Sequence, residues 1–457
     1  MAALRSIIAE PKTAVEIEER YPLSPLQQGM LFHSVYAPDS PVYIGQLSFA
    51  LAGPLDVETF IEAWRRAVAR HAVLRTSFTW ENVDEPLQAV HVRVDLPLEH
   101  LDWRELPDHE RRLDSLLEEE RRRGFELSIA PLMRLKLAQL GDESYTLIWT
   151  HHHLLLDGWS IATLLREIFS DYENLKRGVD EQPPRSREYR DYIAWLGQQD
   201  AARAESYWRT YLKDFRAPTP ISSDHAPANP GREANIQRLR VRLSQSRTSD
   251  LSAFARRQHL TLNTMVQGAW ALLLSRYSCQ KDVVYGATVA GRPANFAGIE
   301  QMVGLFINTL PVRARLPSET YVIDWLRKIQ ADQAGLREYE HSPLVELQAL
   351  SDVPRGAPLF ESLLVFENYP LDVNVLGSGE SLKASDVWWF DQTNYPLTLV
   401  ATPGDELSLE IFYDQHRFTS DVVQRMLVHI QTILAAFIAE PSQRLAHVPI
   451  VTGDERS

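Results

Sequence analysis

The chain has 457 residues, of which 44% are hydrophobic and 24% charged, and its formal net charge is -14 at pH 7. A chain of this length exceeds one simple hydrophobic core and predicts two domains, while the acidic balance argues against nucleic acid as a partner, because binding phosphates requires a basic surface. Cys279 is the only cysteine, so an internal disulfide or a cysteine metal site is excluded, and we expect it to be an ordinary structural residue.

The N-terminal segment, residues 1–20, carries acidic residues and lacks the apolar core of a signal peptide. No later run is expected to supply the about 18 apolar residues that a membrane span needs. The sequence therefore predicts a soluble, cytoplasmic chain with no membrane partner.

The first predicted helix follows Asp56, whose side chain is suited to cap a helix N-terminus. Helical spacing places five apolar residues on one face, which we expect to be core: Val57, Phe60, Ile61, Trp64 and Val68. A second helix is expected to end before Gly124. Its residues 118–123, three glutamates followed by three arginines, predict a solvated face and no anion site.

Two strands are predicted at residues 132–137 and 145–149, which should pair across a short turn. Helical spacing resumes at Ile161, behind an N-cap at Ser160. Between the second strand and this helix lie residues 150–160, Thr-His-His-His-Leu-Leu-Leu-Asp-Gly-Trp-Ser. One strand-to-helix turn therefore carries imidazoles, a carboxylate and a glycine.

These histidines are candidate reactive groups, because imidazole has an unperturbed pKa of about 6.5 and exchanges protons near neutrality. Neighbouring strand residues point to opposite faces, so we expect one of His152 and His153 to face a cleft and the other to pack inward. Charged groups are rarely buried unless paired. Asp157 is therefore expected to pair with a distant arginine that fixes the loop.

The helical periodicity breaks at residues 176–190, where Gly178, two prolines and several basic residues interrupt it. We place the boundary between two lobes there. The second part again offers helix-like segments at 251–259 and 262–277 and a strand-like one at 282–289. The element order predicts two α+β units without fixing how they are oriented.

The pattern His-His-x-x-x-Asp-Gly at residues 152–158 resembles the active-site motif of the condensation domains of nonribosomal peptide synthetases, which are relatives of chloramphenicol acetyltransferase. Other segments are similar to that family's signatures in the expected order, from about Tyr21 to about Ala436. They are residues 24–33 (SPLQQGMLFH), 70–78 (RHAVLRTSF), 189–195 (YRDYIAW), 303–313 (VGLFINTLPVR) and, more loosely, 340–344 (EHSPL).

The resemblance implies an α+β fold of two chloramphenicol-acetyltransferase-like lobes arranged in a V, with the active site in a tunnel at their junction. The N-terminal lobe, which carries the histidine motif, is expected at residues 15–178 and the C-terminal lobe at 191–450. Residues 179–190 are expected to form the linker.

The activity that the resemblance implies is that of an acyltransferase that forms an amide bond. A donor peptidyl or aminoacyl thioester is joined to the amine of an acceptor aminoacyl thioester. Both are tethered to the phosphopantetheine arms of carrier domains, so the chain itself is expected to bind no cofactor and no metal. The implied partners are the donor and acceptor peptidyl carrier domains and the adjacent adenylation domain, and the excised domain is expected to be monomeric.

The resemblance also assigns roles to residues of the motif. His153 is assigned to the acceptor amine, as general base or as hydrogen-bonding positioner, and His152 to the inward-facing, structural place. Gly158 offers a backbone N–H for the phosphopantetheine arm or the developing oxyanion, unless it is needed only for its backbone angles.

The expected partner of Asp157 is Arg292, with Arg75 and Arg313 as alternatives. Four further residues are expected to line the tunnel, unless they only fill the core or satisfy local backbone: Trp159, Ser160, Asn308 and Thr309.

Residues in and around the histidine motif distinguish condensation from the other activities of the same superfamily. Cyclising relatives replace the first histidines with aspartates, and epimerising relatives tend to place serine before tryptophan after the Asp-Gly pair, whereas here Trp159 precedes Ser160. Bifunctional epimerising condensers carry an earlier histidine motif, but the first histidine here is His33. The alternatives to amide formation are an epimerisation-type relative, a transferase that uses a soluble coenzyme A thioester, and a noncatalytic module that recruits a tailoring enzyme. The last usually loses the second histidine or the glycine.

Overall fold

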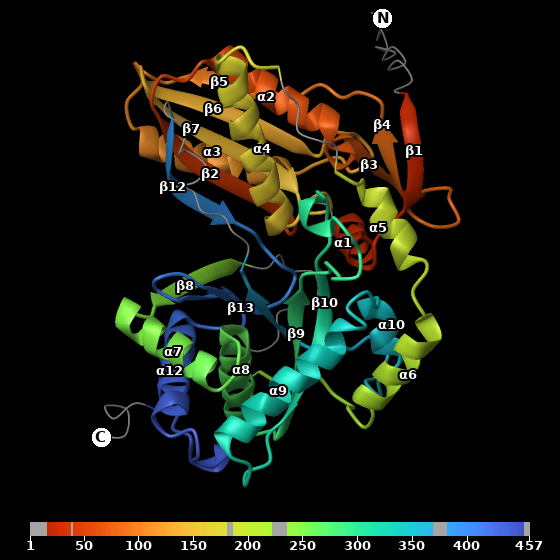
Figure 1. The fold of residues 1–457 in the computed structure, drawn as a ribbon, viewed down its shortest axis with the longest axis vertical. Coiled ribbons are helices and arrows are strands. Elements are labelled where there is room, and N and C mark those ends of the chain that lie inside the picture. The colour runs from red at the N-terminus through yellow and green to blue at the C-terminus, as the bar shows by residue number, and fades with distance from the viewer. Residues whose placement is uncertain (1–15, 38–39, 181–185, 222–234, 369–381, 452–457) are drawn as a thin grey trace, which may run out of the picture.

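Figure 1 shows the computed structural model, which describes residues 16–37, 40–180, 186–221, 235–368 and 382–451. Two lobes lie one above the other in this view, each built around a β-sheet. The first part of the chain forms β1 (Ile17–Pro22), α1 (Pro25–Tyr36), β2 (Ile44–Ala52), α2 (Val57–Arg70), β3 (Thr76–Thr79), β4 (Leu87–His91), β5 (Leu98–Asp102), α3 (His109–Arg123), β6 (Met133–Gly141), β7 (Ser144–His152) and α4 (Gly158–Lys176). The second part forms α5 (Tyr189–Leu196), α6 (Ala201–Tyr211), β8 (Ile236–Arg242), α7 (Gln245–Arg257), α8 (Leu262–Ser278), β9 (Asp282–Val289), β10 (Asn308–Arg315), α9 (Val322–Arg337), α10 (Leu344–Ala349), β11 (Ser362–Phe366), β12 (Lys383–Phe390), β13 (Leu397–Thr402), β14 (Ser408–Asp414) and α12 (Ser420–Ala439).

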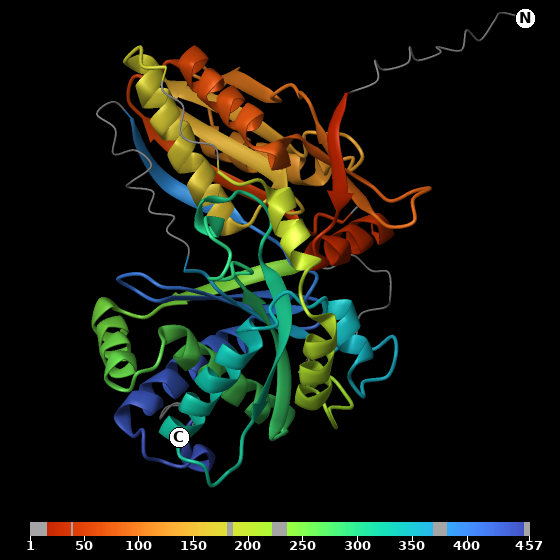
Figure 2. The ribbon, with the colours of Figure 1, turned by 45° about the vertical axis from the view of Figure 1, so that its right-hand side comes forward.

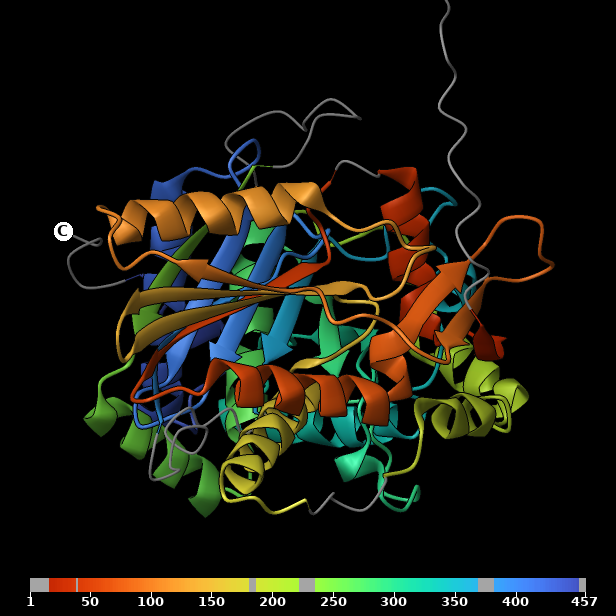
Figure 3. The ribbon, with the colours of Figure 1, turned by 90° about the horizontal axis from the view of Figure 1, so that it is seen from above.

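A five-stranded sheet with the order β12-β2-β7-β6-β5 forms the centre of the first lobe. Seen from above, α2 and α4 cover one face of this sheet and α3 covers the other (Figure 3). Asp56 caps α2 as predicted, because its carboxylate accepts a hydrogen bond from the backbone N–H of Thr59 at 3.0 Å. Strands β6 and β7 pair antiparallel, which confirms the predicted hairpin.

A six-stranded sheet with the order β10-β9-β11-β13-β14-β8 forms the second lobe. Helices α7, α8, α9 and α12 cover the face that lies away from the first lobe (Figure 1). The predicted segments 251–259, 262–277 and 282–289 correspond to α7, α8 and β9. Cys279 is exposed at the C-cap of α8.

Strand β12 belongs to the second part of the chain but joins the sheet of the first lobe. It pairs antiparallel with β2, so that Trp389 lies opposite Leu47 and Phe390 opposite Gln46. Figure 2 shows it lying along the first lobe. The expected C-terminal lobe, 191–450, therefore needs a correction: hydrogen bonding along β2 carries residues 383–390 into the N-terminal lobe.

Four of the six residues in the glutamate and arginine run of α3 are exposed, as predicted for a solvated face, but Glu120 and Arg121 are not. Glu120 is only 2% exposed and pairs with Arg134 at 2.6 Å, on the neighbouring strand β6. The guanidinium of Arg121 lies over the ring of Phe390, 4.7 Å from its centroid. The run therefore fastens α3 to the sheet and to β12, a role that the charge pattern alone did not indicate.

Helix α12 departs from the expectation that no run is long enough for a membrane span. It has 20 residues, and an 18-residue window within it has a mean hydropathy of 1.6, which meets the length and composition of a spanning helix; half of that window is buried. Its buried side chains, among them Val423, Ile430 and Phe437, belong to the core of the second lobe. The helix is accounted for by that packing.

Candidate active site

His153 lines a large cavity between the lobes. Strand β7 ends at His152, so His153 occupies the first position of the turn before α4. Its backbone N–H donates to the carbonyl of Tyr43 at 2.8 Å, and its Nδ1 lies 2.7 Å from the carbonyl oxygen of Leu156. Since a carbonyl oxygen only accepts, Nδ1 carries a proton. Nε2 is the ring nitrogen that is left for other partners.

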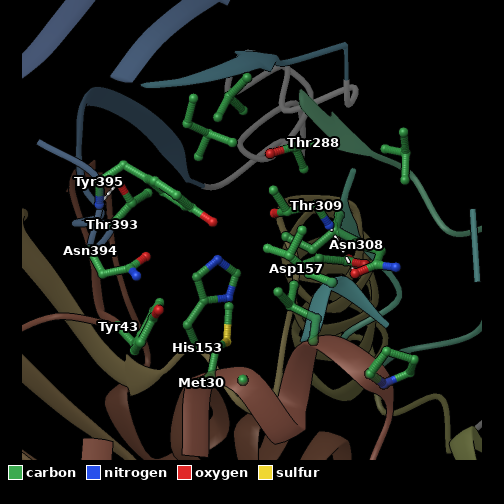
Figure 4. A pocket seen from close by; sticks show the side chains of 18 of the residues that line it. Met30, Tyr43, His153, Asp157, Thr288, Asn308, Thr309, Thr393, Asn394 and Tyr395 are labelled. Carbon is green, nitrogen blue, oxygen red and sulfur yellow. Dashed lines mark hydrogen bonds between the residues drawn. The ribbon is translucent and has the colours of Figure 1, made fainter. Parts of the chain in front are cut away.

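The cavity has a volume of about 800 Å³, and both lobes line it. Met30 and Tyr43 contribute from the first lobe, and Thr288, Thr309 and Tyr395 from the second, around the imidazole of His153 (Figure 4). The Tyr395 hydroxyl points toward the space above that ring (Figure 4). A largely apolar enclosure with few polar groups is the kind of site that holds an acyl substrate in one orientation.

Asp391 is the partner of His153 that the sequence did not reveal. It follows β12 directly, and its Oδ2 lies 3.2 Å from Nε2 of His153. Burial alone would lower the pKa of His153, but the Asp391 charge and hydrogen bond outweigh it and raise that pKa to about 9. In the sequence, Asp391 is visible only as one acidic residue after the aromatic residues 388–390. This position carries no information about the partner of the carboxylate.

The other two histidines of the turn are buried and uncharged. Burial lowers the pKa of both His151 and His152 to about 3. Nδ1 of His152 accepts the backbone N–H of Leu154 at 3.2 Å, and its Nε2 lies 3.4 Å from Oγ of Ser34. The inward place expected of His152 is therefore occupied as predicted, while His151, which had no assigned role, borders the cavity.

Opposite shifts of these pKa values predict that folding stability declines on both sides of neutrality. Below about pH 6.5 the unfolded chain protonates His151 and His152 while the folded chain does not, so stability falls as pH falls. His153 has a raised pKa, so its contribution is complete below 6.5 and is lost as pH rises through about 9. Urea unfolding across this range measures both limbs. His153→Gln should flatten the alkaline limb and leave a reduced acid limb, because the charge of His153 helps to lower the pKa of His151 and His152. An unchanged alkaline limb would contradict the assignment.

Asp157 forms the expected ion pair with Arg292, since its Oδ1 lies 3.3 Å from Nη2 of the arginine. The same oxygen accepts the backbone N–H of Ser160 at 2.8 Å, so Asp157 and not Ser160 is the N-cap of α4. Its Oδ2 accepts the backbone N–H of Phe306 at 3.0 Å, from the segment before β10. Asp157 therefore joins the histidine turn to the second part of the chain.

The two alternative arginines have other partners. Arg75 pairs with Glu18 at 2.9 Å, and Arg313 pairs with Asp282 at 2.6 Å. Both guanidinium groups lie outside the Asp157 contact, which leaves Arg292 as the arginine that fixes the loop.

Ser160 and Trp159 hold the turn against the second part of the chain. The Ser160 hydroxyl donates to the carbonyl of Gly304 at 2.7 Å and accepts the N–H of the same residue at 3.0 Å. Trp159 donates its indole N–H to the carbonyl of Glu300 at 3.2 Å. The Ser160 hydroxyl also accepts a hydrogen bond from the Arg292 guanidinium at 2.9 Å. Trp159 is among the residues that line the cavity, and Ser160 is not.

Gly158 and Thr309 line the cavity, whereas the amide of Asn308 is engaged elsewhere. Gly158 is the first residue of α4, and its φ is not positive, so special backbone angles do not explain the glycine. The Asn308 amide nitrogen donates to the carbonyls of Glu340 and Ser342, both at 2.8 Å. Asn308 lines the cavity as well, so its side chain both borders this space and bonds to nearby backbone carbonyls. In the described part of the chain, no three His, Cys, Asp or Glu side chains are grouped to hold a metal ion.

Comparison with known proteins gives a consistent result. The family model "Condensation domain" matches residues 17–457. One of the linear gramicidin synthase proteins of Brevibacillus parabrevis is 44% identical over 446 residues, which cover 96% of this chain and 6% of that protein. Bacitracin synthase 3 of Bacillus licheniformis is 35% identical over 461 residues, which cover 100% of this chain and 7% of that protein. The chain therefore spans only a small part of the length of these curated relatives.

Solved structures share the fold. A four-domain nonribosomal peptide synthetase bound to AMP and glycine superimposes with a TM-score of 0.83 at 20% identity, covering 98% of this chain and 35% of the other. The X-domain in complex with OxyB from teicoplanin biosynthesis gives 0.81 at 23% identity, covering 96% and 98%. Since a likeness at this identity supports the fold alone, function has to be argued from the site.

Proposed function

The chain belongs to the condensation-domain family of nonribosomal peptide synthetases, and from this premise we propose that it forms a peptide bond between two thioester substrates. The amine of an acceptor aminoacyl thioester attacks the carbonyl of a donor peptidyl or aminoacyl thioester. The observation that carries the proposal is that His153, with Asp391 beside its Nε2, lines a cavity formed by both lobes. His153 and Gly158, which noncatalytic relatives tend to lose, are both present there.

The reaction needs a group that accepts or hydrogen-bonds the proton of the acceptor amine. A free α-amino group has a pKa of about 7.7 to 8.0, so much of it is protonated at neutral pH and is not nucleophilic. Nε2 of His153 orients this proton while it is itself protonated, or takes it once it has lost its own proton, because Nδ1 is held by the carbonyl of Leu156. Gly158 offers an unobstructed backbone to the reacting carbonyl at the first turn of α4.

Positioning contributes alongside this proton transfer. Holding two tethered reactants in line is worth about 7 to 11 kcal/mol, whereas acid–base help is worth roughly 10²- to 10⁴-fold. The cavity of about 800 Å³ is large enough for both reacting acyl groups. We propose that it is the centre of a tunnel that the phosphopantetheine arms of donor and acceptor carrier domains enter from opposite ends, presenting their acyl groups as thioesters.

The remaining assignments follow from the same proposal. The partners are two peptidyl carrier domains and the adenylation domain of the same synthetase, in the cytoplasm, and the chain needs no cofactor of its own. The proposed units are residues 15–178, the linker 179–190 and residues 191–450, with β12 contributed back to the first unit.

The test is a mass-spectrometric condensation assay in which separately loaded donor and acceptor carrier proteins are offered to the chain. A set of L and D donors is used, and the same acyl groups are offered as coenzyme A thioesters. Peptide on the acceptor carrier is the expected result. Transfer from coenzyme A alone would favour a soluble-donor transferase, and epimerised donor without peptide would favour an epimerisation-type enzyme. Binding of carriers or of another enzyme, without any product, would favour a recruiting module.

A further inference from the structure

Among the described residues, the carboxylate of Asp391 has one side-chain partner, His153. Asp391 lines both the main cavity and an adjoining cavity of about 440 Å³. Its Oδ2 faces His153, and its buried Oδ1 has no side-chain donor among the described residues, while the backbone N–H of Gln392 lies close enough to the carboxylate to lower its pKa. A buried acceptor without a donor is costly to a fold. The Asp391 side chain as a whole is 29% exposed and borders both cavities, so a donor on a ligand can reach this carboxylate beside His153.

The surroundings of Asp391 select a cationic donor. The Asp391 carboxylate is charged at neutral pH, because the positive His153 lowers its pKa against the effect of burial. His151 is uncharged, and the hydroxyls of Tyr43 and Tyr395 stay protonated, since burial raises the pKa of each well above 10.

Two arginines also border these cavities, but each pairs with another carboxylate: Arg240 with Glu410 at 2.8 Å and Arg292 with Asp157 at 3.3 Å. His33 on α1 has a pKa lowered by burial, and His152 is neutral. Glu367, which also borders both cavities, accepts a hydrogen bond from the hydroxyl of Thr402 at 3.0 Å. The site thus offers a full carboxylate whose only cationic partner among the described residues is His153.

We propose that Asp391 is the binding site for the α-ammonium group of the acceptor aminoacyl thioester, which it holds next to Nε2 of His153. This proposal rests on the proposed function and names the residue that receives one of its two substrates. Nothing in the histidine motif supplies such an anion, because Asp157 is already bonded to Arg292, Ser160 and Phe306.

Binding of the ammonium has a consequence for protons. The free site holds an imidazolium and a carboxylate, and the arriving ammonium adds a second positive charge beside one negative charge. Two buried cations sharing one anion are disfavoured, so one proton leaves to solvent. The amine nitrogen and the imidazole then share the remaining proton over Asp391.

With one proton released to solvent, the bonds formed and broken in the reaction balance. The amine lone pair forms a C–N bond to the donor carbonyl carbon, and the carbonyl π electrons move to oxygen. Collapse of this species breaks the C–S bond, and the departing sulfur takes the proton that nitrogen gives up, by way of Nε2 of His153. Ammonium and thioester become amide, thiol and the one proton released on binding.

The direct test measures how many protons the wild-type chain releases when it binds a ligand that carries the ammonium group. Glycyl-pantetheine amide and acetyl-pantetheine amide differ only by the ammonium group, and neither is a thioester. Calorimetric titration at pH 7 in two buffers of different ionisation enthalpy should show release of about one proton with the glycyl probe and none with the acetyl probe. Equal affinity for the two probes, or no proton release with the glycyl probe, would overturn the proposal without touching the proposed function.

Variants on the same strand connect the site to turnover. Asp391→Asn should raise the KM for the acceptor carrier at least about tenfold and leave the KM for the donor carrier unchanged. Asp386→Asn, at an exposed position of β12, is the matched control and should behave as wild type. A lower kcat with an unchanged acceptor KM would mean that Asp391 acts only through His153, which contradicts the proposal. Absence of peptide with wild type would instead refute the proposed function, and the proton count would still decide the role of Asp391.

Discussion

Replacing His153 with alanine is expected to slow peptide-bond formation by about 10²- to 10⁴-fold, the range in which one acid–base group contributes. The substitution removes the imidazole whose Nε2 faces the cavity, while the backbone bond from His153 to the carbonyl of Tyr43 is kept. Residual activity should persist, because the tethered substrates still meet in line. Single-turnover rates with preloaded donor and acceptor carriers measure the effect without product release.

The matched control for this prediction is His100→Ala. His100 is exposed on β5, at the edge of the first lobe's sheet opposite β12, and should be replaceable without loss of rate. Unchanged turnover in His153→Ala would remove His153 from the mechanism.

The pH dependence of the rate separates the two roles of His153. Asp391 raises the pKa of this histidine to about 9 against the effect of burial, so the free protein holds an imidazolium at neutral pH. A general base has to be unprotonated, so that role predicts a rate that rises with pH up to about 9. A hydrogen-bonding imidazolium predicts a rate that falls over the same range, once the acceptor amine is itself deprotonated.

The sequence was most informative where neighbours along the chain decide the structure. The cap of α2, the β6–β7 hairpin and the strand-to-helix turn all follow from local patterns, and the pairing of Asp157 with Arg292 follows from the need to compensate a buried charge. Strand β12 could not be assigned to a lobe, because a strand's partner is set by tertiary contacts that leave no local trace. Asp391 was missed for the same reason: it reaches His153 only through the pairing of β12 with β2.

Asp157→Asn should destabilise the fold by about 3 to 5 kcal/mol, the usual cost of removing one partner from a buried ion pair. The side chains of Asp157 and Arg292 are 2% and 7% exposed, so the guanidinium left behind has little access to water. Both carboxylate oxygens accept hydrogen bonds, one from Ser160 and Arg292 and the other from Phe306. An asparagine has one acceptor oxygen, so its NH₂ group has to face one of these donors.

Chemical denaturation of wild type and Asp157→Asn measures this cost, and loss of activity should accompany the loss of stability. Asp282→Asn is the control, because Asp282 pairs with Arg313 but is 39% exposed, so water compensates its removal and the cost should be smaller. The double variant Asp157→Asn/Arg292→Leu should recover part of the stability, since it removes the stranded charge. Lost activity with an unchanged unfolding free energy would mean that Asp157 acts on the substrates and does not serve mainly to hold the histidine turn against the second part of the chain.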